Sequence, residues 1–429
     1  MENLSEQTQH LFLKLCVVWS CVVTSWAILS STVPLILKDV VGASRAAEWL
    51  GIFTATTAFS GMILASLLGH FSDRFGRIEM LLPWLVVYFL ANVGVVYGDI
   101  RKELFPLWLA RLPALSIPGA VLFALASDVG TGSTVLRLHG MFGASSGVAL
   151  LIGGFTCGVV SKHFSRSSAL SVAVLFSAAA ALATSLLVKA APAIPRRSTV
   201  DSYRVAAFYI LRKDPLLRNL IVSFSLVRVA NVNLYFMFVI FANYKLKWDV
   251  FDTSIALGLN GSLGVFWQFF GLKFIVQKFD NVVPVLIGFV CCSQLVMLAI
   301  GLAATSTQMY CATIMYSMYG MMSSIFTAKI SVLGSEAGIA GLSLGLVATL
   351  QNSVEIWLAV AFGKILGWTM LNYSPAHVLS GLPFFCNSVV LMLAAMIVVH
   401  GHHCHGQQRM AWIHHGDDDV VSDFKSTAQ

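Results

Sequence analysis

Twelve apolar runs, each about as long as a bilayer is thick, constrain this chain more than any other feature. A bilayer-spanning helix needs about 20 mostly apolar residues, and backbone polar groups in lipid must be satisfied within the protein. The composition agrees: 57% of the 429 residues are hydrophobic and 11% are charged, against about 45–50% and 25% in soluble domains. We therefore expect an all-α polytopic membrane protein, and an ordinary soluble enzyme is excluded. The runs lie at about 11–37, 49–70, 79–98, 105–127, 138–160, 168–189, 219–243, 253–273, 283–304, 307–329, 340–366 and 379–400.

The runs divide six and six around a polar, arginine-rich stretch. We expect an N-terminal six-helix bundle over 1–189, a linker over 190–218 and a C-terminal six-helix bundle over 219–400. A tail rich in His and Asp follows at 401–429. The halves are nearly equal in length, which predicts two pseudo-symmetric bundles.

The distribution of positive charge indicates the orientation. With the N-terminus in the cytoplasm, cytoplasmic segments hold 16 of the 27 Lys and Arg residues, the opposite side holds 8, and three lie inside runs. Cytoplasmic loops of membrane proteins are enriched in Lys and Arg. We expect both termini in the cytoplasm, in the plasma membrane or an internal membrane. The net charge of +7 then reflects these loops and not nucleic-acid binding.

The fifth and eleventh runs repeat a glycine pattern at a constant offset. Small residues at this spacing let transmembrane helices approach closely, and repeated units with a site between them are typical of alternating-access transporters. The two sets are Gly140, Gly143 and Gly147, and Gly338, Gly341 and Gly345.

The segment between the second and third runs reads Gly69-His-Phe-Ser-Asp73-Arg74-Phe-Gly76-Arg77. It resembles the loop signature of the major facilitator superfamily, Gly-x-x-x-Asp-Arg-x-Gly-Arg, at all five defining positions. Glycines permit a tight turn, and an aspartate is favoured near a helix N-terminus. The resemblance implies a twelve-helix transporter in which this motif latches the halves in one conformation without touching the solute.

A second resemblance is to the tetracycline/proton antiporters and related drug exporters. Arg111 stands where that branch carries a membrane arginine, and Asp128, Arg137 and Gly140 follow in similar order. The resemblance implies a proton-linked or structural role for Arg111. Ala149-Leu150 replaces the Gly-Pro of that branch, which leaves a facilitative uniporter open.

Glu355 is the only acidic residue well inside an apolar run. It lies about 15 residues into the eleventh run, or roughly 22 Å at 1.5 Å per residue, which is near mid-membrane. Gln351 and Asn352 lie close to it on the same helix. Ionisable groups inside a membrane mark functional sites, and a carboxylate in apolar surroundings can bind and release a proton near neutral pH. Glu355 is thus the candidate proton carrier, or the partner of a cationic solute; the alternative is a structural carboxylate paired with Arg228.

Arg228 lies near mid-depth in the seventh run, with Asn231 and Tyr235 on its face. This face can hold an anionic solute or pair with Glu355. Further candidates for the solute site are Asn260 in the eighth run and Tyr316 in the Met- and Tyr-rich tenth run, where side chains of these types suit a lipophilic solute.

Other activities find little support in the sequence. No phosphate-binding loop is present and no catalytic constellation stands out, so we expect neither an enzyme nor a cofactor. The tail carries His and Cys, which are ligands that zinc takes, so a metal transporter or a metal-sensing tail stays an alternative. Their spacings match no defined metal site, and none is predicted.

These patterns together predict a monomeric secondary transporter that is surrounded by membrane lipids and moves a small organic solute, with lipophilic solutes among the candidates. Proton coupling and export are favoured. The alternatives are a proton-coupled importer, a facilitative uniporter, or a transporter-like sensor or lipid-moving protein.

Overall fold

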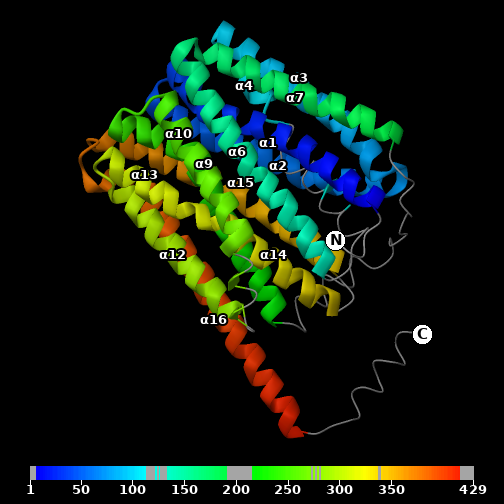
Figure 1. Cartoon of the computed structure of the whole chain (residues 1–429). Coiled ribbons are helices and arrows are strands. Elements are labelled where there is room, and N and C mark those ends of the chain that lie inside the picture. Colours follow the sequence, from blue (N-terminus) through cyan, green and yellow to red (C-terminus); the bar gives the residue numbers. More distant parts are fainter. Residues whose placement is uncertain are drawn as a thin grey trace.

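The computed structural model describes residues 6–112, 121–122, 125, 133–190, 215–271, 274–275, 278–279, 282–336 and 340–415, with the backbone alone in parts of some helices. Its regular structure is helical throughout (Figure 1). This confirms the all-α fold class, and the reason is physical: a helix satisfies its own backbone hydrogen bonds in lipid.

The helices follow the predicted runs in order. Those of the first half are α1 (Glu6–Val41), α2 (Ala43–Phe75), α3 (Arg77–Arg101), α4 (Leu104–Leu109), α6 (Ser133–His163) and α7 (Arg166–Ala190). Those of the second half are α9 (Pro215–Leu246), α10 (Val250–Phe266) with the π-turn η1 (Trp267–Gly271), α12 (Val283–Leu302), α13 (Ser306–Met315), the 3₁₀ turn η2 (Tyr316–Met318), α14 (Tyr319–Glu336), α15 (Ala340–Asn372), η3 (Val378–Gly381) and α16 (Leu382–His415).

Two predicted regions lie largely outside the described residues: most of the fourth run beyond α4, and most of the linker. The last helix differs from the expected boundary at 400, because α16 continues to His415. A helix can continue past the end of an apolar run, because its backbone hydrogen bonds do not depend on apolar side chains. In Figure 1 this end of α16 projects beyond the other helices.

Seven described helices are long and apolar enough, by length and composition, to cross a membrane. The tenth run is divided among α13, η2 and α14. The seven spans are Gln9–Val41, Arg77–Arg101, Gly140–His163, Arg166–Val188, Val283–Leu302, Leu346–Asn372 and Val378–Cys404.

Single glycines form two of the sharpest connections. Gly42 separates α1 from α2 with φ +85°, and Gly76 separates α2 from α3 with φ +113°. Residues other than glycine rarely adopt these backbone angles. We call the end of the molecule that holds Gly42 the turn end; α1 begins at the opposite end.

Glycine-lined helix contacts join the two halves. Gly363 of α15 is so close to α2 that a Cβ atom there would lie 2.7 Å from the Ala47 carbonyl oxygen. Gly154 of α6 is as close to α10, where a Cβ would lie 2.6 Å from the Ser254 carbonyl oxygen. In each pair, the second helix of one half meets the fifth of the other, as expected of two repeats related by a pseudo-two-fold axis (Figure 1).

Polar contacts tie the helices together at the turn end. Arg166 at the start of α7 binds Asp39 of α1 at 2.6 Å and Asp99 of α3 at 2.9 Å, and Lys102 binds Asp99 at 2.8 Å. Across the halves, Lys38 donates a 2.8 Å hydrogen bond to the Asn243 side chain of α9. With the glycine contacts, the Lys38–Asn243 hydrogen bond holds the halves together at this end, while the ion pairs of Arg166 and Lys102 join helices within the first half.

Candidate functional site

A buried carboxylate lies between two arginines from different halves of the molecule. Glu355 in α15 is 8% exposed, and it interacts electrostatically with Arg228 of α9 and Arg111, which follows α4. Arg111 is also 8% exposed. The structure thus brings together all three of the charged side chains that the sequence indicated as candidates for the site.

The backbone around Arg111 is fixed to α2. The Thr57 hydroxyl donates a 3.0 Å hydrogen bond to the Arg111 carbonyl oxygen. One turn earlier, the Trp108 indole N–H donates to the Thr56 hydroxyl at 3.1 Å. These bonds hold the end of α4 against α2, while the Arg111 side chain interacts with Tyr88 of α3 and with Glu355.

Arg228 contacts a tyrosine pair created by an irregular helix. The 3₁₀ turn η2 separates α13 from α14 and stacks Tyr316 on Tyr319, with ring centroids 5.4 Å apart. Arg228 hydrogen-bonds the Tyr319 side chain, which also interacts electrostatically with Glu355. Tyr316, a predicted solute contact, is 2% exposed and stacks on Tyr319.

Gln351 adds a polar group one turn from Glu355. Its side-chain Nε2 is buried and has no hydrogen-bond partner among the described residues, and a buried donor without a partner is costly. Asn352 beside it is half-buried. The Gln351 Nε2 can therefore donate a hydrogen bond to a solute without breaking a hydrogen bond seen in the structure.

Two polar residues of the eighth helix have different surroundings. Asn260 is 5% exposed and donates a 2.9 Å hydrogen bond to the Thr313 carbonyl oxygen, so its nitrogen ties α10 to α13. Gln268 belongs to the π-turn η1, a type of irregularity frequent at functional sites. Its side chain lies beside Gly143 of α6 and accepts a 3.1 Å hydrogen bond from Ser324 of α14.

The signature motif spans a helix end, not a loop. Residues 69–75 form the last turns of α2, Gly76 alone makes the connection, and Arg77 begins α3. The glycine at position 76 lets one residue reverse the chain, which is why no longer loop is needed. The structure does not describe the side chains of Asp73 and Arg74 in this motif. The same holds for Asn231 and Tyr235 in α9.

Sequence reasoning did not single out Tyr88, and it named Tyr319 only as one of several tyrosines in the tenth run. It placed Gln268 with Asn260 as lining of the cavity. Uncharged residues in apolar runs give no signal by themselves, because Tyr and Gln also occur as packing residues. The one available sign was the density of tyrosines around position 316.

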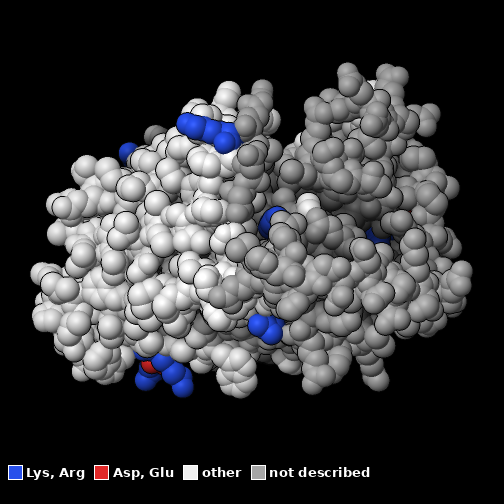
Figure 2. All heavy atoms as spheres, turned by 90° about the horizontal axis from the view of Figure 1, so that it is seen from below, with Lys and Arg blue, Asp and Glu red and all other residues white. Residues whose placement is uncertain are grey.

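Neither a metal centre nor a nucleic-acid surface is seen in the part of the chain that the structure describes. There, no group of three or more His, Cys, Asp or Glu side chains could hold a metal ion. In Figure 2 the described Lys and Arg side chains lie apart from one another, and an acidic side chain accompanies those at the lower edge. A phosphate backbone is bound by many clustered basic groups, which the described part of this face does not offer.

The chain is similar in sequence to curated bacterial proteins. It is 23% identical over 371 residues to the class B tetracycline resistance protein of Escherichia coli, covering 85% of this chain and 90% of that protein. It is 25% identical over 266 residues to the class H tetracycline resistance protein of Pasteurella multocida, covering 59% and 64%.

Solved structures show the same fold at low identity. The xylose transporter XylE from E. coli, in a partially occluded inward-open conformation, has a TM-score of 0.68 at 16% identity, covering 92% of this chain and 98% of that one. The human organic anion transporter MFSD10 has a TM-score of 0.64 at 12% identity, covering 91% and 99%. The family model of the Major Facilitator Superfamily matches residues 15–357. The chain is therefore a multi-pass membrane transporter of a small solute, and it belongs to the major facilitator superfamily.

Proposed function

We propose that this transporter is proton-coupled and that Glu355 carries the proton. One observation carries the proposal: Glu355 is buried and faces an arginine from each half. Protonation removes the charge of Glu355 and so weakens its attraction to Arg111 in the other half. A group whose protonation changes an interaction between the halves can link proton binding to alternating access.

The solute binds beside this cluster, in contact with Arg228, Gln351 and Tyr319. The unpartnered Gln351 nitrogen supplies a hydrogen-bond donor, and the tyrosines supply apolar surface with polar hydroxyls. A small organic solute with an aromatic or lipophilic body and a few polar groups fits these side chains. Asn352, Asn231 and Tyr235 belong to the same proposed site by their positions along α15 and α9.

Export is the favoured direction. The curated relatives named above are tetracycline resistance proteins, and a transporter gives resistance to a drug by lowering its concentration inside the cell. We further propose that the protein acts as a monomer with both termini in the cytoplasm, that residues 1–189 and 219–400 move as the two units, and that the motif around Gly76 latches them.

A proton-coupled importer is the second candidate, and the charge of the cluster favours it. With Glu355 ionised, two arginines and one carboxylate sum to +1; protonation leaves +2. If the solute is an anion, a proton on Glu355 strengthens its binding, so proton and solute bind to the same state. A cationic solute competes with the proton instead, which gives antiport.

Transport by purified protein in liposomes tests the proposal. Lipophilic cations, organic anions, sugars and amino acids are offered with a pH gradient in each direction. We expect gradient-dependent movement that Glu355→Gln abolishes, while Glu103→Gln, at an exposed position, retains it. Full gradient-dependent transport by the Glu355→Gln variant would rule out Glu355 as the proton carrier. Solute movement that raises the proton flux in the same direction would identify the importer.

A further inference from the structure

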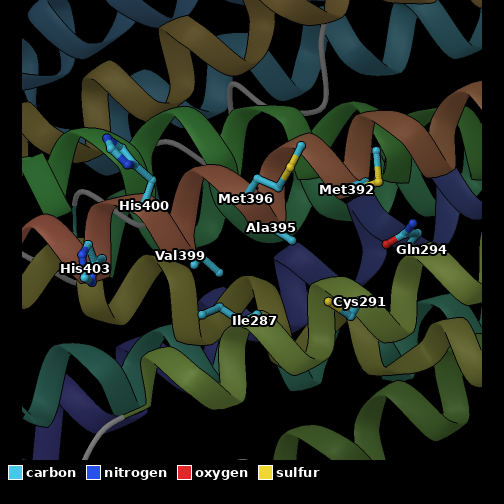
Figure 3. A pocket seen from close by; sticks show the side chains of 9 residues that line it. All are labelled: Ile287, Cys291, Gln294, Met392, Ala395, Met396, Val399, His400 and His403. Carbon is cyan, nitrogen blue, oxygen red and sulfur yellow. The ribbon is translucent and has the colours of Figure 1, made fainter.

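A groove between α12 and α16 is unrelated to the buried charges. It has a volume of about 500 Å³ and is lined by residues one and two turns apart on each helix, so it follows the helix axes (Figure 3). Its lining residues are Ile287, Cys291, Gln294, Met392, Ala395, Met396, Val399, His400 and His403.

The two helices touch at one end and separate toward the other. Near the turn end, Gly381 lies against Gly301, where a Cβ added to Gly381 would be 2.7 Å from the Gly301 Cα. Such close backbone contact leaves no space between the helices. Farther along, the small Ala395 forms the floor, and Val399 and Met396 are about half exposed at the sides.

The depth of the groove matches one leaflet of a bilayer. Met392 lies near the middle of the apolar span Val378–Cys404, and His403 lies at its end. Their separation of eleven positions corresponds to about 16 Å at 1.5 Å per residue, which is close to half of the roughly 30 Å hydrocarbon core. The groove therefore runs from mid-membrane to the surface at which α16 leaves the bundle.

Most of the lining is apolar, and polar side chains lie at both ends of the path. Methionine and aliphatic side chains cover most of the length together with Cys291, Gln294 lies beside Met392 at the mid-membrane end, and the imidazoles of His400 and His403 lie at the surface end (Figure 3). α12 begins at Val283, one turn before Ile287, at the same end. Imidazole N–H groups and helix N-termini both favour a phosphate group.

We propose that this groove binds one phospholipid, with an acyl chain along α12 and α16 and its phosphate at His400 and His403. The length of the groove favours a hydrocarbon chain over a helix of a second copy. About 16 Å is close to the depth of one leaflet, whereas a spanning helix of a second copy would extend across the whole hydrocarbon core of roughly 30 Å.

Alkylation of native cysteines tests the site without any substitution. Cys291 lines the groove, and its neighbour Cys292 is also exposed but lies outside the lining. Delipidated protein in detergent is treated with N-ethylmaleimide with and without phosphatidylglycerol carrying 16- or 18-carbon chains. We expect the lipid to slow labelling of Cys291 at least five-fold and of Cys292 less than two-fold. Equal slowing of both cysteines, or of neither, would overturn the proposal.

Native mass spectrometry with a matched pair of variants counts the bound lipid. Val399→Trp fills the groove; Val389→Trp adds the same bulk on the same helix at a position of similar exposure, 51% against 49%, outside the lining. We expect the fraction of protein that retains one phosphatidylglycerol to fall at least five-fold in Val399→Trp only. Unchanged retention in Val399→Trp, or a dimer that this variant dissociates, would refute the lipid as occupant.

The headgroup contact has its own control. Replacing His400 and His403 together by Ala should lower retention of phosphatidylglycerol, but not that of a diacylglycerol with the same chains, which lacks phosphate. An equal loss of both lipids, or no loss of either, would show that the phosphate is not bound at the imidazoles.

Discussion

Gly154 is the position where a single methyl group should shift the balance between conformations of the transporter. A Cβ atom there would lie 2.6 Å from the Ser254 carbonyl oxygen and 2.7 and 2.8 Å from the Gly258 nitrogen and Cα. All three atoms belong to the α10 backbone, so no side chain can rotate away. Ordinary contact begins near 3.4 Å, so Gly154→Ala must move α6 and α10 apart by about 0.8 Å.

The energetic cost follows from overpacking. Extra methyl groups in a well-packed interior cost about 1–3 kcal/mol, which corresponds to a roughly 5–150-fold change in an equilibrium constant. Alternating access requires the halves to separate at the turn end, and that movement relieves the clash. Gly154→Ala should therefore destabilise the closed arrangement seen here relative to one that is open at the turn end.

Distances between spin labels measure this shift. Labels at Phe164, after α6, and Lys247, before α10, are both exposed and report the separation of the two helices in a background without native cysteines. Gly140→Ala is the control, because it lies on the same helix and a Cβ there has no atom of the described residues within 4 Å. Indistinguishable distance distributions in the two variants would refute this reasoning.

Further predictions concern stability and solute binding. Asp99→Asn should lower the thermal stability more than Asp39→Asn, because the Asp99 side chain is 2% exposed against 50% for Asp39; breaking a buried pair costs about 3–5 kcal/mol and an exposed one about 0–1 kcal/mol. Equal melting temperatures of the two variants would contradict this. Gly76→Ala should destabilise by about 1–3 kcal/mol because of its φ of +113°, whereas Gly288→Ala, a helical position with open space around it, should not; thermal melts of both compare the two. Tyr319→Phe should weaken solute binding several-fold by removing the hydrogen bond with Arg228, and Tyr310→Phe, whose hydroxyl bonds the Asp252 carbonyl oxygen, should bind solute normally.

The helices could be predicted from the sequence because the bilayer leaves few choices. Length and apolar character specify a spanning helix, and runs such as 138–160 and 283–304 match α6 and α12 within a few residues. The junctions were harder. The sequence placed a loop around Asp73, whereas α2 continues to Phe75 and a single glycine makes the connection. The irregular turns η1 and η2 could not be predicted, since they depend on packing between helices.

Part of the site could be predicted for the same reason. A charge in lipid is costly, so Glu355, Arg111 and Arg228 stood out in their runs, and the structure places them in one cluster. Uncharged members did not stand out. Nothing in the sequence distinguishes Asn260, which bonds a helix carbonyl, from Gln351, whose nitrogen has no partner among the described residues. Glycine spacing predicted close approach of the fifth helix at Gly140, Gly143 and Gly147. A Cβ at Gly147 would lie 3.1 Å from the Gly261 carbonyl oxygen of α10, whereas one at Gly140 would have no described atom within 4 Å, and only the fold identifies α10 as the partner.

The two arginines should have different effects on transport, because they belong to different halves. Arg228 and Glu355 lie in the same half, so rocking of the halves leaves their interaction nearly unchanged. Arg111 lies in the other half, and its attraction to Glu355 changes when the halves move. Arg111→Gln should therefore uncouple solute movement from the pH gradient while solute still binds, whereas Arg228→Gln should chiefly weaken solute binding. Binding to detergent-solubilised protein and gradient-driven uptake separate the two effects. The opposite result would refute this assignment: Arg228→Gln would uncouple transport with normal solute binding, and Arg111→Gln would leave coupling intact. Arg228, in the same half, would then control the proton on Glu355, and the contact between Arg111 and Glu355 would be structural.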